Sequence, residues 1–355
     1  MSFVVVEDIS SIPDDLYGAV IALGVFDGVH LGHRRVLSMA LDRANVLDKP
    51  SAVVTFDPNP RDLLNRQDVL FQLTSLEIRS QLVRDFGLDA VFVVPFTRDI
   101  ADLSPSAFID QVLVGKLKVG AVAVGKNFFF GKGQVGSSLF LQTSLARLGV
   151  SVCVVDVARA PDGSVISSTS IRAALAKGDI KAANALLGCN WYVSSTIERC
   201  KGRGTRLGFP TVNMRLHPGC KLAHGVYSVL FDVCGTRYPG VSYFGARPQF
   251  EQGGAPMLEV HAFGMSRDVY GCHATVTFVS HIRPEMTFPS TKEFIDRLHV
   301  DIAEAKRVLG LPSAFDEETS EKAPEISSSF DQENRRGYSE YLQSSFDPES
   351  MEKVI

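Results

Sequence analysis

Two histidines and three glycines stand close together in residues 21–33, whose sequence is IALGVFDGVHLGH. An apolar run at residues 19–23 precedes the glycines and is typical of a buried strand, and apolar residues recur at a helical period after His33. A glycine loop between a strand and a helix directs backbone N–H groups and the positive end of the helix at phosphate. Imidazole N–H groups add donors for charge that develops on phosphorus. The sequence therefore predicts a nucleotide site at His30 and His33.

Other chemistries for this loop have weaker support. The spacing of His30 and His33 also suits a metal site, but no CxxC pair, third clustered histidine or HExxH sequence accompanies it. A second alternative is that both histidines are satisfied surface residues. The loop lacks the Gly-Lys-Ser/Thr of a P-loop and the GxGxxG of a dinucleotide site, so the sequence excludes both of those classes.

Residues 24–33 resemble the GxFDGxHxGH signature of the nucleotidyltransferase superfamily. Two further segments, ISSTSIR at residues 166–172 and RGTRLGFPTVN at residues 203–213, make the chain similar to the prokaryotic bifunctional riboflavin kinase/FMN adenylyltransferases, or FAD synthetases. The resemblance covers about residues 15–310. It implies an enzyme that phosphorylates riboflavin to FMN and then adenylylates FMN to FAD with release of pyrophosphate. ATP is the implied co-substrate of both steps, with Mg²⁺ as the cofactor.

Adenylyl transfer needs donors and cations rather than a strong base, because the attacking FMN phosphate is already an anion. The resemblance implies that His30, His33 and Arg172 are catalytic. It also implies nucleotide contacts from Gly24, Phe26, Asp27, Gly28, Gly32, Asn59, Ser167, Ser168 and Thr169, and flavin contacts from Asn127, Phe128 and Phe130. Taken alone, residues 166–172 are typical of a capped helix start, and residues 128–130 suit a hydrophobic core as well as they suit a flavin site.

Two positions depart from the family pattern. Asn59 stands where the family has a histidine, and Asn cannot carry a charge. Phe129 stands where the family has an arginine, although Lys126 and Lys132 lie near it in sequence. These departures leave an alternative open, in which the chain is a riboflavin kinase with a weakened adenylyltransferase domain.

Phosphorylation of riboflavin needs a base, because the nucleophile is a primary alcohol, and it needs a metal and donors for the γ-phosphoryl group. The resemblance implies that Thr211 and Asn213 hold Mg²⁺ through hard oxygen ligands and that Glu259 is the base. The glycine loop adds nucleotide contacts from Gly202, Arg203, Gly204, Arg206, Gly208 and Pro210. Strand alternation places Glu259 and His261 on one face. Without the resemblance, Glu259 would be interpreted as a solvated strand residue.

The spacing of apolar runs predicts two different folds. In the first half, strand-like runs at residues 51–56, 90–96, 119–125 and 150–157 alternate with helix-length segments at 75–86, 104–114 and 137–148. This alternation indicates an α/β domain, a Rossmann-like parallel sheet with helices on both faces. Ligands bind such sheets at the carboxyl ends of strands, where both the histidine loop and residues 57–62 are expected.

The pattern of the second half predicts a small antiparallel barrel. Residues 171–188 read as two short helices broken at Gly178 and Asp179, followed by short alternating strands and a final helix at 291–309. With the activities that the resemblance implies, we predict an adenylyltransferase domain at residues 1–187, a riboflavin kinase domain at 188–312 and an acidic, disordered tail at 313–355.

The composition of the 355-residue chain limits which classes of partner and which cellular location we expect. The net charge is −4, and the tail alone contributes −7, so the rest of the chain carries about +3, too little for a nucleic-acid binder. The sequence shows no signal peptide and no apolar run long enough to span a membrane. Six scattered cysteines suit reduced thiols in a cytoplasm. The expected partners are thus small molecules, with neither nucleic acid nor membrane.

The tail repeats one short sequence, as SAFDEE at residues 313–318, SSFDQE at 328–333 and SSFDPE at 344–349. The repeat predicts a motif for a protein partner, and the alternative is a solvated acidic tail in which low complexity produced the likeness. A third functional hypothesis, a non-catalytic flavin- or nucleotide-binding sensor, would use the tail as its contact.

Overall fold

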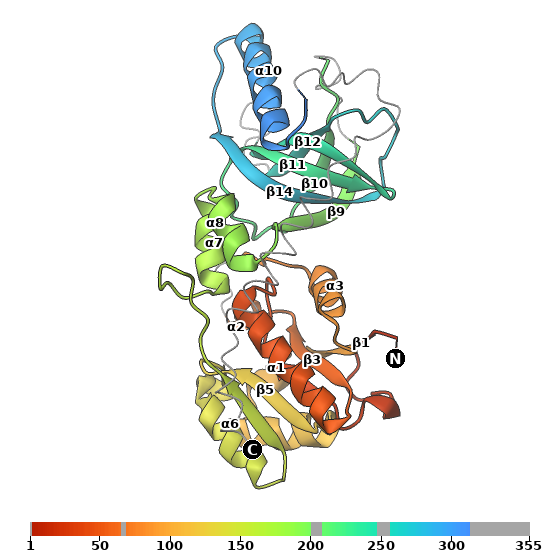
Figure 1. The fold of residues 1–355 in the computed structure, drawn as a ribbon, viewed down its shortest axis with the longest axis vertical. Helices are drawn as coiled ribbons and strands as arrows, with labels where there is room; N and C mark the ends of the chain where they lie inside the picture. The colour runs from red at the N-terminus through yellow and green to blue at the C-terminus, as the bar shows by residue number, and fades with distance from the viewer. Residues whose placement is uncertain (1, 65–68, 200–207, 247–255, 313–355) are drawn as a thin grey trace. The chain divides into compact units, whose positions relative to one another are not determined.

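The computed structural model describes residues 2–64, 69–199, 208–246 and 256–312 (Figure 1). Contacts between Cα atoms divide the chain into two compact units, Met1–Ser170 and Ile171–Ile355. The predicted boundary after residue 187 stays a prediction, and the predicted tail and its repeats lie outside the described residues. Among the described residues, no helix has both the length and the apolar character needed to cross a bilayer.

The first unit is built on a six-stranded sheet with the order β1-β4-β3-β2-β5-β8, in which every pair of neighbours is parallel. Its strands are β1 (Val4–Val6), β2 (Val20–Leu23), β3 (Ser51–Asp57), β4 (Ala90–Pro95), β5 (Ala121–Gly125) and β8 (Ser151–Val155). Parallel strands buried on both faces read as continuous apolar runs, and β2 is buried at all four positions. The parallel α/β prediction is confirmed.

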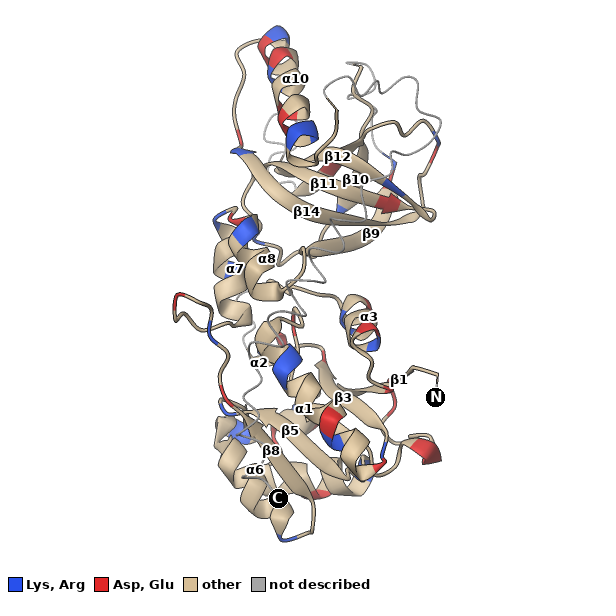
Figure 2. Cartoon of the chain, viewed as in Figure 1, with Lys and Arg blue, Asp and Glu red and all other residues tan. Residues whose placement is uncertain are grey.

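Helices cover both faces of this sheet because strand residues alternate in direction. On one face, Val20 and Ala22 pack in a cluster with Leu37 of α1 (Leu31–Leu47) and Val83 of α3 (Leu76–Phe86). On the other face, a second cluster joins the sheet to the π-helical segment η2 (Phe108–Lys116) and to α6 (Ser138–Ala146). Figure 2 shows these strands almost free of charged residues.

Short elements fill the connections of the first unit. They are η1 (Asp14–Leu16), α2 (Pro60–Leu64), α4 (Arg98–Ala101), α5 (Pro105–Ala107), β6 (Phe129–Phe130), η3 (Lys132–Gln134) and β7 (Gly136–Ser137). The helix expected over residues 104–114 is present, but most of it is π-helical, which the apolar period does not reveal.

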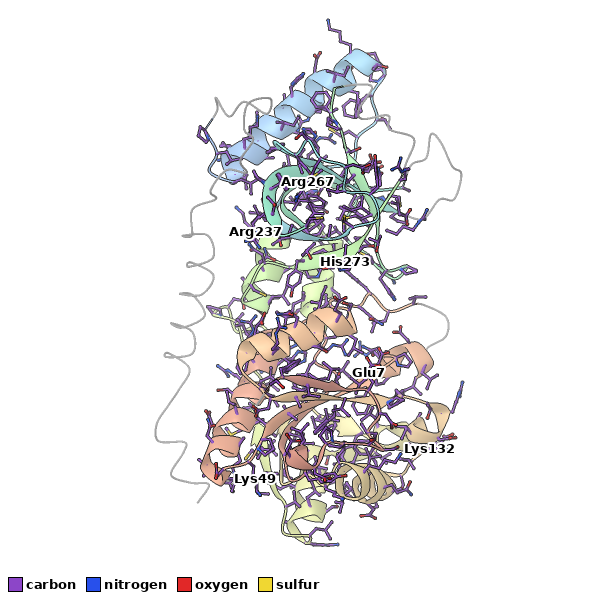
Figure 3. The ribbon with its side chains drawn as sticks, turned by 90° about the vertical axis from the view of Figure 1, so that its right-hand side faces the viewer. Glu7, Lys49, Lys132, Arg237, Arg267 and His273 are labelled. Carbon is purple, nitrogen blue, oxygen red and sulfur yellow. The ribbon has the colours of Figure 1, made fainter. Side chains whose placement is uncertain are left out.

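The second unit contains a closed antiparallel barrel, which Figure 3 shows from the side, and its strand order is β10-β13-β12-β11-β14-β9. Its strands are β9 (Tyr192–Glu198), β10 (Val212–Arg215), β11 (Gly225–Val233), β12 (Thr236–Gly245), β13 (Met257–Ala262) and β14 (His273–Pro284). Closure leaves no unpaired sheet edge. The predicted small antiparallel barrel is confirmed.

Two short helices precede the barrel, α7 (Ser168–Ala176) and α8 (Ile180–Leu187), and they break where the sequence predicts. Their end is tied to the barrel by Asn184, whose amide nitrogen donates to the Phe278 carbonyl and whose amide oxygen accepts from the Trp191 N–H. The Ala223 N–H also donates to the Leu175 carbonyl. Most of this helical pair therefore packs as part of the second unit.

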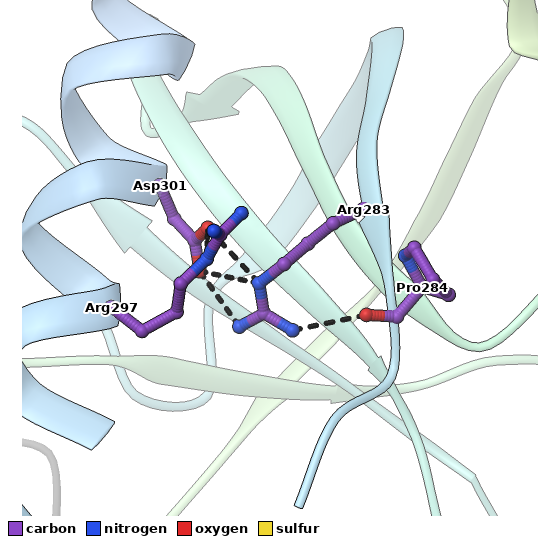
Figure 4. Close-up of polar contacts among 4 residues, drawn as sticks. All are labelled: Arg283, Pro284, Arg297 and Asp301. Atoms are coloured by element: carbon purple, nitrogen blue, oxygen red, sulfur yellow. Dashed lines mark hydrogen bonds and ion pairs between the residues drawn. The ribbon is translucent and has the colours of Figure 1, made fainter. Parts of the chain in front are cut away.

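Helix α10 (Thr291–Val308) covers the barrel through Ile302 and Ala305, which pack with Val226 and Val241. Beside this apolar contact lies a buried ion pair (Figure 4). Asp301, with 0% exposure, accepts three hydrogen bonds from the Arg283 guanidinium of β14 and one from Arg297 of its own helix. The hydrogen bonds from the two guanidinium groups replace the water that the Asp301 carboxylate loses on burial. Because Arg283 belongs to β14, its bonds to Asp301 attach the helix to the barrel.

Candidate active sites

His30 begins helix α1, which follows the carboxyl end of β2. Its backbone is extended, and its Nδ1 atom accepts a hydrogen bond of 3.2 Å from the His33 N–H, so the imidazole is the N-cap of the helix. A ring nitrogen that accepts carries no proton, so the neutral ring bears its proton on Nε2. This arrangement makes His30 a donor beside the positive end of a helix, as binding of phosphate requires.

The two imidazoles of this loop are stacked. The ring centroids of His30 and His33 lie 3.5 Å apart at 17°, and the Phe26 ring meets His33 edge-on at 5.2 Å. A Cβ atom on Gly32 would lie 3.1 Å from the His30 ring, so glycine is what allows this ring to lie against the helix start. The structure thus brings His30 and His33 together with two glycines that each lie against a ring: Gly24 against Phe26 and Gly32 against His30.

The loop backbone between strand and helix is strained. Phe26 and Val29 have φ angles of 54° and 40°, in the region that favours glycine, and Gly28 has a φ of 89°. For a β-branched residue such as Val29 this conformation is costly and persists only where neighbours impose it. The Gly28 N–H donates to Thr74 Oγ1 at 3.0 Å, and the Val29 N–H donates to the Phe26 carbonyl.

Asp27 connects the histidine loop to residues 73 and 74. Its carboxylate is buried, and it accepts hydrogen bonds from the N–H groups of Leu73 and Thr74 at 2.9 and 3.0 Å. These bonds join two segments that are 46 residues apart in sequence. The side chain of Asp27 therefore has a structural task, and its implied contact with the nucleotide stays a prediction.

Arg79 of α3 is a buried residue of this site that the sequence did not indicate. Its guanidinium donates to Thr55 Oγ1 at 3.0 Å, and the Thr55 hydroxyl donates to the Val25 carbonyl at 2.9 Å. Burial lowers the pKa of Arg79, and the carboxylates of Asp27 and Asp57 oppose that change. The Thr55 hydroxyl thus links the Arg79 guanidinium to the backbone of the loop at Val25.

The ISSTS segment is hydrogen-bonded to the loop. Ser168 Oγ donates to the Asp27 carbonyl at 2.9 Å, and Ser167 Oγ accepts from the Ser170 N–H at 3.1 Å. Thr169 is exposed. Arg172 lies one turn further along α7 and belongs to the second compact unit, so its catalytic role stays a prediction.

Asn59 is buried directly after β3, behind the cis bond between Asp57 and Pro58. Its Oδ1 atom accepts from the Arg61 N–H at 3.1 Å, which satisfies one donor in the first turn of α2. The residue that replaces the family's histidine therefore has a local structural function. Like the histidine loop, it lies at the carboxyl end of a strand, where ligands bind such sheets.

The three implied flavin residues have different surroundings. Phe130 is buried in the sheet core, Phe128 stacks on it with ring centroids 5.5 Å apart, and Asn127 is exposed. Phe129 is 56% exposed, so the ring that reaches solvent is the one that departs from the family pattern. The nearby Lys126 is paired with Asp156. Flavin binding at this hairpin stays a prediction.

The second site forms in the barrel. Gly202, Arg203, Gly204 and Arg206 lie outside the described residues. Gly208 has a φ of 85°, a conformation that glycine adopts without strain, and the Pro210 carbonyl lies 2.8 Å from Nδ1 of the buried His261. His261, on β13, therefore holds the end of the glycine loop at the point where it enters β10.

Strand register brings the two implied catalytic elements together. Asn213 of β10 is directly opposite Glu259 of β13, and Tyr243 of β12 is opposite Glu259 on its other side. Side chains of directly opposed residues share a face with Cβ atoms about 5 Å apart. Asn213 is buried and Glu259 is half-buried. The base and the metal ligand implied by the resemblance are therefore neighbours on one surface of the barrel.

Tyr243 extends this row into a carboxylate network that the sequence did not indicate. Its hydroxyl donates to Glu285, whose other oxygen lies 3.3 Å from His224 Nδ1. Burial raises the pKa of Tyr243, and the Glu285 and Glu259 carboxylates raise it further. The phenol therefore stays protonated beside Glu259.

The donor set of the barrel site suits a hard cation. Thr211 offers a hydroxyl and Asn213 an amide oxygen, and Glu259 adds a carboxylate on the next strand. Oxygen ligands of this kind bind Mg²⁺, which usually keeps several waters and contacts substrate phosphates. Within the described ranges, no group of three or more His, Cys, Asp or Glu could hold a metal by itself. The residues fit a magnesium ion shared with a nucleotide.

Comparison with known proteins gives the same division of the chain. A family model described as FAD synthetase matches residues 12–170, and one described as riboflavin kinase matches residues 187–309. Bifunctional riboflavin kinase/FMN adenylyltransferases of Pseudomonas fluorescens and Listeria monocytogenes are 34% and 36% identical to this chain. These matches cover 84% and 79% of this chain, and 94% and 90% of the relatives.

A solved structure has a similar fold. The crystal structure of a protein from Streptococcus pneumoniae, described as a macrolide-efflux protein, is 25% identical with a TM-score of 0.75. The match covers 85% of this chain and 97% of that chain. The combination of a parallel α/β unit and a closed barrel therefore recurs in an experimental structure.

Proposed function

This chain belongs to the family of bifunctional riboflavin kinase/FMN adenylyltransferases, so it makes FMN and FAD, and we propose that each step uses its own site, one in each compact unit. The adenylyltransferase site is the histidine loop of the parallel sheet. The kinase site is the row of Asn213 and Glu259 in the barrel. The observation that carries this proposal is the direct pairing of these two residues across β10 and β13.

In the adenylyltransferase site, a phosphate oxygen of FMN attacks the α-phosphorus of ATP, and pyrophosphate leaves. Negative charge spreads over the oxygens of the α-phosphate as the new bond forms. The Nε2–H of His30, the adjacent His33 and the start of α1 lie where they can donate to that charge. Because the loop is held by Asp27 and Ser168, these donors are in position before the substrate binds.

In the kinase site, Glu259 accepts the proton of the riboflavin primary hydroxyl while the oxygen attacks the γ-phosphorus of ATP, and ADP leaves. Thr211 and Asn213 would hold Mg²⁺, which neutralises charge on the phosphates. Tyr243 stays protonated and donates to Glu285, so a neutral hydroxyl lies on the strand next to Glu259. His261 positions the glycine loop by holding the Pro210 carbonyl.

The two-site proposal is tested by following both reactions in one sample. Purified protein with riboflavin, ATP and Mg²⁺ is expected to form FMN first and FAD later, as chromatography of the flavins measures. Asn213→Ala should abolish FMN formation from riboflavin but leave FAD formation from added FMN unchanged. Equal loss of both steps in this variant would contradict two independent sites.

Family membership favours a working adenylyltransferase over the weakened domain or the non-catalytic sensor, and the intact histidine loop supports this choice. The proposed partners are riboflavin, FMN and ATP. Because ATP is the co-substrate of both steps, we place the protein in the cytoplasm. A partner for the repeated tail sequence stays a prediction.

A further inference from the structure

Two cysteines that are far apart in sequence meet at one end of the barrel. The Sγ atoms of Cys234 and Cys272 lie 3.3 Å apart, although 38 residues separate them in the chain. Both are free thiols, and Cys234 is exposed. A disulfide has an S–S separation of about 2.05 Å, so the two sulfur atoms would have to approach by about 1.3 Å to form one.

Cys234 occupies a position that ordinarily belongs to another residue type. It and Gly235 form the two-residue turn between β11 and β12, and their φ angles are 48° and 75°. Two-residue hairpin turns with two positive φ angles prefer Asn or Asp followed by Gly. A cysteine here adds backbone strain, and in return it presents its thiol at the tip of the hairpin.

The backbone around both thiols is well anchored. The Arg267 guanidinium donates to the Val233 carbonyl at 2.7 Å, directly before Cys234. On the other side, the Cys272 carbonyl accepts from the Ile197 N–H at 3.0 Å. Figure 3 labels Arg267 on the barrel, together with His273, which follows Cys272. The fold therefore holds the two sulfur atoms in proximity, and a thiol–thiol hydrogen bond joins them.

We propose that Cys234 and Cys272 are an oxidative modification site, a dithiol that a low-molecular-weight disulfide converts to an intramolecular disulfide. The Cys234 thiolate attacks one sulfur of the oxidant, whose S–S bond breaks and releases the first thiol. Cys272 then loses its proton and attacks the Cys234 sulfur of the mixed disulfide, which releases the second thiol. In balance, the protein loses two electrons and two protons, and the oxidant becomes two thiols.

The order of these steps follows from the surroundings. The neighbouring Cys234 sulfur raises the pKa of Cys272, so Cys272 keeps its proton and the exposed Cys234 reacts first. Two of the other thiols are poor competitors. Burial raises the pKa of Cys220 to about 11 and also raises the pKa of Cys153, so both stay protonated and inert at neutral pH.

The experiment uses the full, reduced chain and oxidised glutathione as the probe. We expect the number of titratable thiols to fall by two from the six in the sequence, and the mass of the chain to fall by about 2 Da. Tryptic digestion should give residues 222–237 joined to residues 268–292, and dithiothreitol should separate them.

Variants make the assignment specific. Cys234→Asn keeps a residue that suits the turn, and Cys272→Ser keeps the size of the side chain, so both should fold, as riboflavin kinase activity checks. Neither should form the cross-linked peptide, whereas Cys153→Ser should form it as fully as the parent chain. A stable glutathione adduct at Cys234 without the cross-link would overturn the proposal, and so would a disulfide that includes Cys200.

Discussion

The two nucleotide sites that we propose for this protein are assembled in different ways. His30 and His33 are three residues apart in one loop, and their geometry comes from a helix start. Asn213 and Glu259 lie on different strands, and their geometry comes from the register of the barrel. The first site can therefore be recognised in a short stretch of sequence, while the second exists only once the sheet has paired. Local and non-local assembly should respond differently to mutation.

The supports of the two sites differ as well. Around the histidine loop, a strained backbone is held by long-range hydrogen bonds, one that the Gly28 N–H donates to Thr74 and one that the backbone accepts from Ser168. In the barrel, continuous strand pairing sets the positions, and single side chains such as His261 adjust the ends. Removal of one supporting side chain should thus lower the activity of the first site only in part. The second site should fail mainly when a chemical group or the barrel itself is lost.

The largest expected effect is on the barrel chemistry. Glu259→Gln removes the proposed base while keeping the size of the side chain, and we expect riboflavin kinase kcat to fall by roughly 10²–10⁴-fold. FAD formation from FMN should not change. Glu198→Gln is a matched control, because Glu198 is opposite Asn213 on β9 but pairs with Arg215 at the surface. A similar loss in the control would mean that charge in this row, rather than a base, drives the reaction.

The next effect tests whether the barrel supports its site as a whole. Asp301→Ala leaves the buried Arg283 without its carboxylate, and we expect the second unit to lose about 3–5 kcal/mol of stability. Denaturant unfolding followed by fluorescence of Trp191, the single tryptophan, reports this unit alone. Glu304→Gln breaks a solvent-exposed pair with Arg307 and should leave the stability of the second unit nearly unchanged. Equal losses in the two variants would mean that the buried pair stabilises the second unit no more than the exposed pair does.

At the histidine loop we expect a loss that is confined to one reaction. His33→Ala removes a donor from the stacked pair, and adenylylation of FMN should slow by roughly 10²–10³-fold. Riboflavin kinase activity in the same preparation is the internal control, measured by FMN formation. If the kinase slowed to the same degree, the two sites would not be independent.

The smallest effect concerns a support of the loop. Ser168→Ala deletes one hydrogen bond to the Asp27 carbonyl, a loss of about 1 kcal/mol, so adenylylation should slow by roughly fivefold. Thr143→Ala removes an exposed hydroxyl that donates to carbonyls of α6, and it should leave the rate unchanged. An unchanged rate in Ser168→Ala would mean that the loop keeps its geometry without this bond.

The sequence predicted what local pattern encodes. Apolar periodicity indicated the parallel sheet, the barrel and the break between α7 and α8, and glycine spacing indicated the histidine loop. Arg79 and Tyr243 were missed because their importance comes from tertiary neighbours, Thr55 and Glu285, that no local pattern announces. The cysteines looked scattered for the same reason, since Cys234 and Cys272 meet only through the pairing of β11 with β14.

The attachment of α8 to the barrel has a practical consequence for dissecting the gene. A kinase fragment that begins at residue 188 would lack Asn184, and the Phe278 carbonyl and the Trp191 N–H would lose the amide that satisfies them both. Starting the fragment at residue 171 retains that amide, together with the buried side chains of Ile180, Ala183 and Leu187. The shorter clone should aggregate during expression, and the longer one should yield folded protein.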